Sequence, residues 1–383
     1  MSDTEIKFLY LNEEDMVKAG VLDADRCVDC LEDVMKLLSE GDCLMGGRNR
    51  NEHGIQLMFP KESPIEGFPL EDSRDRRFMA MPAYLGGRFH MAGAKWYGSN
   101  GRNAAKDLPR SILMMTLNDV ETGQPMAHMS ANLLSAMRTG AMPGLTAKYL
   151  AKKDARVISV LGPGAINKTA LACILAKVTS IDTVKIKGSS ATSKTALDFK
   201  DYVERKFPQI KNIILCDSLE EAIRDVDIVS EGVSVAGRTW PVIDVDWIKP
   251  GCLFISSGTV DFNDHDFIVK KMGKVVDNIK MYEEYINWYE EYYEDGSRKS
   301  SGTPGMYFVN EISDGLIEKD QVKHLGDIIR GITQGRESDD QIILVSLGGM
   351  PILDVGWGLD CYKKALELGI GTELLLWEEP YKL

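Results

Sequence analysis

Short apolar runs alternate with longer amphipathic segments through the middle of the chain. The apolar runs predict strands at 156–161, 183–187, 212–216, 228–233, 253–257, 274–277 and 341–346. The segments between them predict helices from about residue 165, around 193–206 and at 219–224. Strands that alternate with helices of this length are typical of a parallel, doubly wound sheet. We therefore expect a Rossmann-type α/β domain in this part of the chain.

The first third of the chain follows a different pattern. Residues 24–40 repeat apolar positions at helical spacing and predict a helix. Closely spaced apolar runs at 78–84, 88–97 and 111–118 predict antiparallel strands rather than strand–helix–strand units. The segment 60–76 is rich in proline and charge, so we expect a surface loop there.

Two further helices are expected outside this region. The stretch 130–153 predicts a long helix that is interrupted at Gly140 and at Pro143-Gly144. Residues 353–368 predict a helix near the C-terminus.

Composition and charge exclude several classes of protein. The 383 residues carry 45 basic and 58 acidic side chains, a formal net charge of −13, which argues against nucleic-acid binding because phosphates need a basic face. No apolar run approaches the ~20 residues that span a bilayer, and the acidic N-terminus does not resemble a signal peptide. We therefore expect a cytoplasmic enzyme without a membrane partner.

The seven cysteines predict no metal site. Cys27 and Cys30 form a single CxxC inside the helical segment, without a second pair or a nearby histidine cluster. Ordinary reduced thiols are the expected state of these cysteines.

The turn Gly162-Pro163-Gly164 follows the first strand of the α/β series and carries the first chemical signal. Gly162 allows a tight turn out of the strand, and Gly164, which lacks a Cβ, lets the backbone approach a phosphate at the N-terminus of the next helix. Asn167 stands where the third glycine of GxGxxG belongs. The pattern predicts a dinucleotide site, and the alternative is a glycine-rich turn without a ligand.

The end of the second strand bears on the choice of cofactor. An NAD enzyme usually has an acid there for the ribose 2′-OH. Asp182 precedes the strand, whereas Lys187, Ser189 and Ser190 lie at its end with Lys194 close behind. Cations and hydroxyls suit a 2′-phosphate, so we expect NADP as the preferred cofactor, with NAD possible. The alternative is a solvated loop that happens to carry lysine.

Several sequence motifs carry a family resemblance. The run LLSAMRTGAMPGLTAKYLAKKDARVISVLGPG, residues 133–164, resembles the signature of the ornithine cyclodeaminase/mu-crystallin family. MPAYLGG, GAKWYGSN and LNDVETGQPMA precede it, and WPVI, KPG, GIT-GR and QIILVSLGGMP with Asp354 follow it. In order and spacing the resemblance covers nearly the whole chain from about residue 78.

The resemblance implies an architecture and an activity. It implies a homodimer in which a Rossmann domain (136–335) is inserted into a smaller α+β substrate and dimerisation domain (1–135 and 336–383). Members are cyclodeaminases, imine reductases, amino-acid or opine-type dehydrogenases, and a cofactor-binding crystallin. They share hydride transfer at the carbon that bears an amine or imine. The resemblance therefore implies an NAD(P)-dependent oxidoreductase acting on an amino acid, imine or amine.

The resemblance also implies site residues. Lys95, on an apolar strand, and Arg138, in an apolar helix, match positions that hold the substrate carboxylate, which cations bind well. Their alternative role is snorkelling or capping. Arg48 or Arg50 is the expected third cation. The implied cofactor-binding residues are Thr139, Gly162, Pro163, Gly164, Ala165, Ile166, Asn167, Lys187, Ser189, Ser190, Lys194, Gly232, Val233, Ser257 and Gly258.

Two positions depart from the cyclodeaminase pattern. Met79 stands where that pattern has a glutamate, and Gln56, an alternative alignment, is not an acid either. Thr259 occupies the place of an aspartate, with Asp261 two residues further on. Cyclodeamination needs a base near the imine carbon. The departures therefore favour a dehydrogenase or imine reductase over an ornithine cyclodeaminase. A non-catalytic NADP-binding protein like the crystallin member is the third alternative.

Proton transfer is still required of a dehydrogenase or reductase. Lys95, Asp261, Thr259 or a bound water could provide it. Asp261 has an alternative role in capping the following helix near His265.

The segment KMYEEYINWYEEYYEDG, part of an insertion at 281–305, places tyrosines at three- and four-residue steps with acids opposite. This predicts an amphipathic helix that packs on its own protein or on a partner subunit. The alternative is an aromatic and acidic lid that favours a cationic amine substrate.

Overall fold

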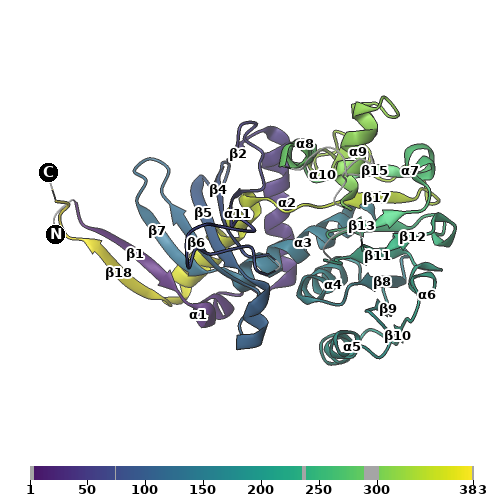
Figure 1. Ribbon diagram of the computed structural model, residues 1–383, viewed down its shortest axis with the longest axis horizontal. Helices are drawn as coiled ribbons and strands as arrows, with labels where there is room; N and C mark the ends of the chain where they lie inside the picture. Colours follow the sequence, from purple (N-terminus) through teal and green to yellow (C-terminus); the bar gives the residue numbers. More distant parts are fainter. Residues whose placement is uncertain (1–3, 74, 235–238, 289–301, 382–383) are drawn as a thin grey trace. The chain divides into compact units, whose positions relative to one another are not determined.

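The computed structural model describes residues 4–73, 75–234, 239–288 and 302–381 (Figure 1). The chain divides into two compact units. Unit 1 contains Met1–Asp23, Glu40–Arg138 and Met350–Leu383, and unit 2 contains Ala24–Ser39 and Thr139–Gly349.

Unit 1 is built on an eight-stranded sheet of order β18-β1-β7-β6-β5-β4-β2, with β3 also paired to β4. Its strands are β1 (Ile6–Leu11), β2 (Cys43–Met45), β3 (Ile55–Met58), β4 (Arg77–Leu85), β5 (Met91–Ser99), β6 (Ser111–Asn118), β7 (Pro125–Ser130) and β18 (Thr372–Trp377). β4, β5 and β6 pair antiparallel, which confirms the expected arrangement of these three strands. β5 begins later than predicted because His90, at a φ of 40°, belongs to the preceding turn.

One face of this sheet is covered by the long helix α11 (Pro351–Leu368), which packs against β4, β5 and β6. Along β4 the residues alternate between buried and more exposed positions from Met79 to Leu85. This alternation follows from the period of two in a strand, which sends successive side chains to opposite faces. Unit 1 also contains α1 (Glu13–Lys18) and the short 3-10 helix η1 (Gly101–Lys106).

β1, β2, β3, β7 and β18 were not evident in the pattern of the sequence. All six residues of β18 are exposed, so no buried face marks it as a strand. β18 is instead held by antiparallel pairing with β1 from the other end of the chain, Tyr10 lying opposite Thr372. Local periodicity cannot reveal such long-range pairing.

Unit 2 is built on an eight-stranded sheet of order β10-β9-β8-β11-β13-β17-β15-β16, in which every pair is parallel. Its strands are β8 (Val157–Leu161), β9 (Thr183–Lys187), β10 (Asn212–Leu215), β11 (Ile228–Glu231), β13 (Leu253–Ser256), β15 (Gly273–Val276), β16 (Val322–His324) and β17 (Ile343–Ser346). The strand order reverses direction between β8 and β11, and ligands of such sheets bind at this switch point. The fold is the expected Rossmann-type sheet.

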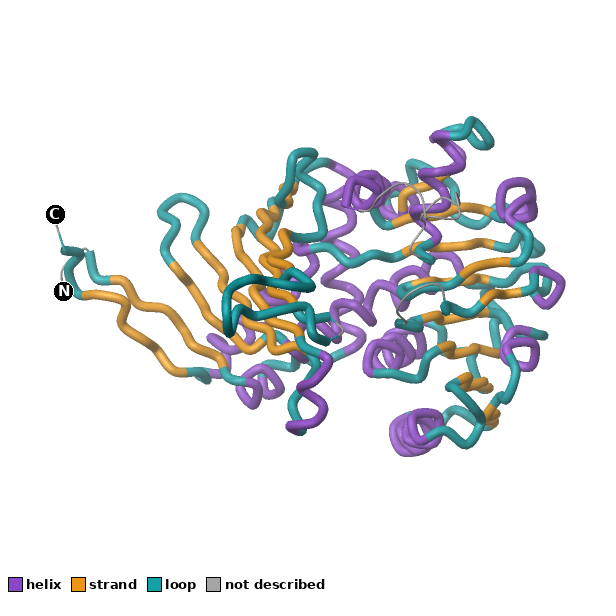
Figure 2. Tube along the Cα trace, viewed as in Figure 1, coloured by secondary structure: helices purple, strands orange, loops and turns teal. Residues whose placement is uncertain are grey.

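Helices lie on both sides of the parallel sheet, purple beside orange strands in Figure 2. They are α2 (Ala24–Glu40), α4 (Ala165–Lys177), α5 (Lys194–Lys206), α6 (Leu219–Ile223), α7 (His265–Lys271), α8 (Ile279–Trp288), α9 (Pro304–Ser313) and α10 (Leu325–Ile329). A small pair, β12 (Val242–Ile243) and β14 (Asp261–Phe262), lies outside this sheet, and the unit also has the 3-10 helices η2 (Val245–Trp247) and η3 (Lys319–Gln321). In the described part of the chain no helix combines the length and apolar character needed to cross a bilayer.

The predicted interruption at Gly140 and Pro143-Gly144 is wrong, because α3 runs unbroken from Asn132 to Leu150. A Cβ on Gly140 would come within 2.5 Å of the backbone of α4, and one on Gly144 within 2.6 Å of Cys173. The glycines therefore let two helices approach closely rather than end one of them.

The division into units differs from the expected boundaries in two places. The helix at 24–40 was assigned to the first domain, but all of α2 except its last residue belongs to unit 2, where its Asp25 and Asp29 each lie 2.6 Å from Lys177. The return to the first domain was expected at 336, yet unit 2 continues to Gly349. The reason is that β17 pairs with β13 and β15 inside the parallel sheet.

The aromatic segment begins as the predicted helix, α8. Its Tyr282 is buried and donates a hydrogen bond to Asp277 at 3.1 Å, so this end packs on its own unit. The rest of the segment, including Tyr289, Tyr292 and Tyr293, lies outside the described residues.

Candidate functional site

The glycine turn joins β8 to α4 as the sequence predicts, and its two glycines serve different purposes. Gly162 has a φ of 79°, and a Cβ there would lie 3.1 Å from the backbone of Gly232 and Val233. Gly164 is the N-cap of α4, and a Cβ there would meet nothing within 4 Å. Gly162 is thus needed for the turn itself, whereas Gly164 borders open space at a helix N-terminus. That space suits a phosphate, because the free N–H groups of the first helical turn point into it.

Asn167 explains the missing third glycine. Its Nδ2 donates to the carbonyls of Leu161 and Gly162, each at 2.8 Å, and its Oδ1 accepts from Ser230 at 2.8 Å. The side chain is 2% exposed. Asn167 therefore ties the turn to β11 instead of offering its side chain to a ligand.

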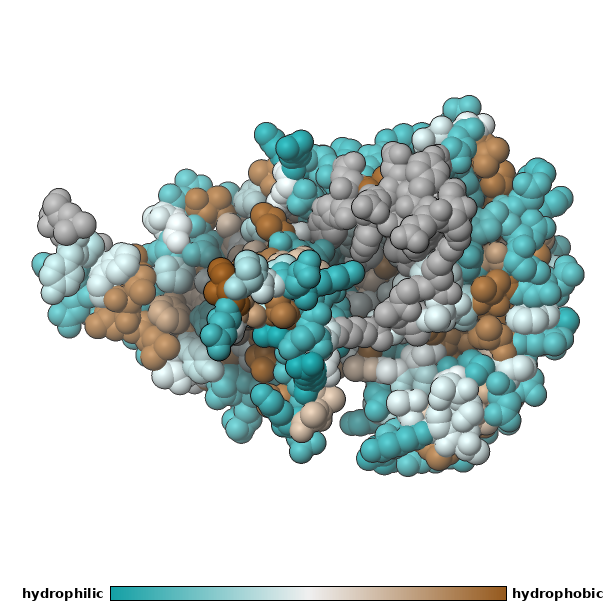
Figure 3. Space-filling model, viewed as in Figure 1, coloured by the Kyte–Doolittle hydropathy of each residue, from teal (hydrophilic) through white to brown (hydrophobic). Residues whose placement is uncertain are grey.

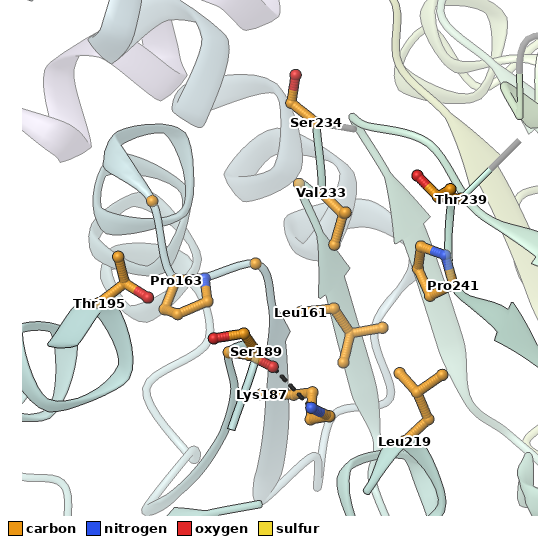
Figure 4. A pocket seen from close by; sticks show the side chains of 14 residues that line it. Leu161, Pro163, Lys187, Ser189, Thr195, Leu219, Val233, Ser234, Thr239 and Pro241 are labelled. Atoms are coloured by element: carbon orange, nitrogen blue, oxygen red, sulfur yellow. Dashed lines mark hydrogen bonds between the residues drawn. The ribbon is translucent and has the colours of Figure 1, made fainter. Parts of the chain in front are cut away.

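A pocket of about 550 Å³ lies at the carboxyl ends of β8, β9 and β11 (Figure 4). Seven of the expected cofactor residues line it: Gly162, Pro163, Gly164, Lys187, Ser189, Gly232 and Val233. Further lining residues are Leu161, Gly188, Thr195, Leu219, Ser234, Thr239 and Pro241. The expected residues Thr139, Ala165, Ile166, Asn167, Ser190, Lys194, Ser257 and Gly258 are not among those that line it. The size of the pocket and its place at the switch point suit a dinucleotide.

Lys187 is the charged residue among the described lining residues, and its Nζ donates to the carbonyl of Gly188 at 2.6 Å (Figure 4). Lys194 begins α5 with an exposed side chain. Asp182 pairs with Arg156 beside the first residue of β9, at the opposite end of the strand from the pocket. Among the lining residues that the structure describes, no carboxylate therefore opposes a 2′-phosphate.

Glu231 is a part of this site that the sequence did not reveal. It is 1% exposed and accepts hydrogen bonds from the N–H of Val233 (2.6 Å), the hydroxyl of Ser256 (2.7 Å) and the N–H of Gly258 (3.1 Å). Burial raises the pKa of Glu231 to about 7. One carboxylate thus joins the two loops that follow β11 and β13. The sequence did contain a signal for Glu231, because it is an acid at the end of an otherwise apolar strand.

The two residues proposed for proton transfer beside these loops have partners of their own. Thr259 donates its N–H and its hydroxyl to the carbonyl of Val233, at 2.9 and 3.1 Å. Asp261 Oδ1 lies 2.8 Å from His265 Nε2 and accepts from the N–H of Phe262. The N-cap of α7 is Asp264, so Asp261 pairs with His265 without capping the helix.

Lys95 and Arg138 come together in unit 1 around a buried carboxylate. Lys95 Nζ lies 2.9 Å from both oxygens of Asp354, and Arg138 Nε lies 3.0 Å from Oδ1. Lys95 is 1%, Arg138 5% and Asp354 0% exposed. Lys95 also donates to the hydroxyl of Ser135 at 3.1 Å. The structure thereby excludes a snorkelling role for these two cations.

The charges of this group are unbalanced. Burial lowers the pKa of Lys95 to about 8. The charge of Arg138 also lowers this pKa, whereas the charge of Asp354 raises it. Burial alone would raise the pKa of Asp354, but the charges of Arg138 and Lys95 hold it below its usual value. Two cations share one anion, so the group carries an excess positive charge that a substrate carboxylate can neutralise.

The other expected residues of unit 1 lie as follows. Arg48 and Arg50 are exposed on the turn between β2 and β3, in contrast to the buried Lys95. Met79 and Gln56, the two alternative positions for a catalytic acid, lie opposite each other in the β3–β4 register. Met79 Sδ accepts a hydrogen bond from Tyr97 at 3.0 Å. Neither alignment therefore places an acid at this position of the sheet.

Comparison with known proteins matches residues 24–368 to the ornithine cyclodeaminase/mu-crystallin family. The chain is 28% identical over 376 residues to the N-((2S)-2-amino-2-carboxyethyl)-L-glutamate dehydrogenase of Staphylococcus aureus, across 97% of this chain and 99% of that one. It is 30% identical over 299 residues to the alanine dehydrogenase of Archaeoglobus fulgidus, across 77% of this chain and 82% of that one. Among solved structures, an archaeal alanine dehydrogenase dimer with bound NAD superposes with a TM-score of 0.74 at 27% identity, covering 97% of this chain and 100% of that one.

Proposed function

The chain belongs to the ornithine cyclodeaminase/mu-crystallin family, and on that premise we propose that it is an NAD(P)-dependent dehydrogenase or imine reductase for an amino or imino acid. The observation that carries this proposal is the buried pair Lys95 and Arg138 around Asp354, in a chain whose other unit contains the glycine turn and its pocket. The dehydrogenases among its relatives support the same reaction class.

The residues have the following roles in the proposed reaction. The bound cofactor supplies or accepts the hydride at the carbon that bears nitrogen. Gly162, Gly164 and the N-terminus of α4 hold its pyrophosphate. Lys95 and Arg138 bind and orient the substrate carboxylate. Lys95, whose pKa of about 8 lies near physiological pH, also holds or moves the proton that accompanies the hydride.

The second candidate for proton transfer is the Asp261–His265 pair. The hydrogen bond of His265 lowers the pKa of Asp261 against the effect of burial, and the same bond raises the pKa of His265. A carboxylate hydrogen-bonded to an imidazole can relay a proton. Thr259 is a further candidate, because its hydroxyl could orient a water.

The alternatives are a cyclodeaminase and a non-catalytic binding protein. The apolar Met79 in place of an acid disfavours the first. The experiment follows nicotinamide absorbance with amino acids, and in reverse with 2-oxo acids and amines, while ornithine is tested in parallel. A net change in the cofactor is expected. Ammonia and proline formed without net cofactor change would establish the cyclodeaminase. Cofactor binding without turnover would indicate the binding protein.

We further propose that NADP is preferred, because Lys187 lines the pocket at the end of β9 and no acid in the described part of the lining opposes it. A charge-assisted hydrogen bond contributes about 1.5–3 kcal/mol. Lys187→Ala should therefore lower the ratio of kcat/KM with NADPH to that with NADH by roughly 10- to 100-fold. Lys200→Ala, at an exposed lysine of α5 that pairs with Glu204, should leave the ratio unchanged. A ratio that is the same in wild type and Lys187→Ala would refute the preference.

We also propose that the chain forms a homodimer through the face of the unit 1 sheet away from α11. Phe78, Trp96 and Met114 are 38%, 43% and 43% exposed there, and Phe78 stacks on Trp96 at 5.6 Å. Brown, hydrophobic side chains also gather over β1 and β18 in Figure 3. An apolar surface of this kind favours association.

Light scattering tests the dimer. Wild type should have twice the chain mass of 42.6 kDa, and Trp96→Glu should shift it towards the monomer, since a charge is costly in an apolar interface. Leu197→Glu, at an equally exposed leucine of unit 2, is the control and should remain dimeric. A dimeric Trp96→Glu would contradict the proposed face.

A further inference from the structure

Arg77 opens β4 on the same face as the buried Met79 and Met81. In the sheet it lies opposite Ser99 of β5, and Lys95 is four residues away along that strand. Tyr97 occupies the position between them on the same face. Arg77 is therefore displaced along the strands from the group formed by Lys95, Arg138 and Asp354.

Tyr97 connects the two positions. Lys95 Nζ lies 5.8 Å from the centre of its ring. At the other end, the Tyr97 hydroxyl donates to Met79 Sδ. Burial raises the pKa of Tyr97, and the nearby charge of Arg77 acts against that rise. Tyr97 is 9% exposed, so a ring that is almost wholly buried separates two cations.

In the part of the chain that the structure describes, the neighbours of Arg77 do not fully neutralise it. Its Nη1 lies 3.6 Å from Asp75, but Asp75 is closer to Arg110, at 3.0 Å. Two arginines thus share one carboxylate and leave one positive charge in excess. Nη1 also donates to the Gln56 amide oxygen at 3.3 Å. Among the described residues Nε of Arg77 is buried without a hydrogen-bond partner, although the side chain as a whole is 27% exposed.

A guanidinium with an unpaired Nε donor, mostly withdrawn from solvent, suits a carboxylate, since its planar fork can bind two oxygens. We propose that Arg77, with Gln56 and the Tyr97 hydroxyl, forms a second anion subsite that binds the distal carboxylate of a dicarboxylic substrate. The inference rests on the proposed function, in which Lys95 and Arg138 bind the carboxylate next to the reacting carbon. The substrate class is then a dicarboxylic 2-oxo acid in the reductive direction, or the corresponding N-substituted or free amino acid.

Two matched substrates isolate the distal carboxylate. 2-Oxoglutarate and 2-oxopentanoate have the same chain length, but only 2-oxoglutarate carries the distal group. With the amine that gives the highest rate, wild type should show kcat/KM at least roughly 10-fold higher for 2-oxoglutarate. Arg77→Met should abolish most of this preference, a change of roughly 10- to 100-fold in the ratio, while leaving 2-oxopentanoate nearly unaffected. Arg77→Lys should restore part of the ratio.

Arg102→Met is the control, because it removes an exposed arginine that pairs with Asp72 rather than with Asp75, and it should keep the preference. Equal losses with both oxo acids in Arg77→Met, or a wild type without preference, would overturn the subsite. Glutarate supplies a readout that does not depend on turnover. Glutarate should raise the unfolding temperature of wild type and Arg102→Met, but not of Arg77→Met, and pentanoate should raise none of them. No cofactor oxidation with any 2-oxo acid would instead count against the proposed function, whatever the glutarate result.

Discussion

Replacing Gly164 by valine is expected to weaken cofactor binding at least about 100-fold, which corresponds to about 2.7 kcal/mol. A side chain at this N-cap meets nothing within 4 Å in the protein, so it would extend into the space where the pyrophosphate binds. The backbone at Gly164 is extended, at φ −97° and ψ −172°, which valine adopts readily. The free energy of unfolding should therefore change by no more than about 1 kcal/mol.

Gly162→Ala is the matched comparison, and its main effect should be on the free energy of unfolding. Its positive φ and the 3.1 Å approach to Gly232 predict a stability loss of about 1–2 kcal/mol or more. Titration with NADH and NADPH by fluorescence, together with urea unfolding, measures both effects. Cofactor affinity that survives in a folded Gly164→Val would contradict the assignment of this turn.

Lys95→Met is expected to lower kcat/KM by roughly 10²- to 10³-fold, because losing one partner of a buried charge pair costs about 2–5 kcal/mol. Arg138 still neutralises Asp354 in this variant, so folding should survive. The kcat/KM of the wild-type enzyme should depend on pH for the same reason, because Lys95 binds the carboxylate in its charged form. Burial lowers the pKa of Lys95 to about 8, so its charged form dominates at pH 7 and is lost as the pH rises through that value. Log kcat/KM should then fall by one unit per pH unit above about 8.

Lys364→Met, at a lysine of α11 that is 42% exposed, should keep both the rate and the pH profile of wild type. A flat profile between pH 7 and 10, or a Lys95→Met enzyme of normal kcat/KM, would show that Lys95 does not bind the carboxylate in its charged form.

The parallel sheet and its glycine turn could be predicted because both depend on local signals. Apolar runs at regular spacing indicated the strands of the unit 2 sheet except β16, and Gly162 and Gly164 stood between a strand and a helix. Lys95 and Arg138 were identified as charges in apolar surroundings and by a family motif. Identifying these two residues did not require knowing which segments of the chain are in contact in the fold.

What the sequence could not reveal depends on long-range pairing. Asp354 lies on α11, 259 residues from Lys95, and nothing local shows that it pairs with two cations. Gly140 was interpreted as a helix break, because glycine destabilises a helix and its packing against α4 is not visible in the sequence. The carboxylate of Glu231 and the subsite at Arg77 likewise appear only once neighbouring strands are aligned.

The central claim is that this chain moves a hydride between a nicotinamide cofactor and the carbon that bears nitrogen. The most direct measurement is mass spectrometry of the amine formed from a 2-oxo acid and an amine with reduced cofactor deuterated at the transferring position. The account predicts one deuterium at that carbon for each cofactor oxidised. Cofactor oxidation without deuterium in the product, or product formed without cofactor oxidation, would contradict it.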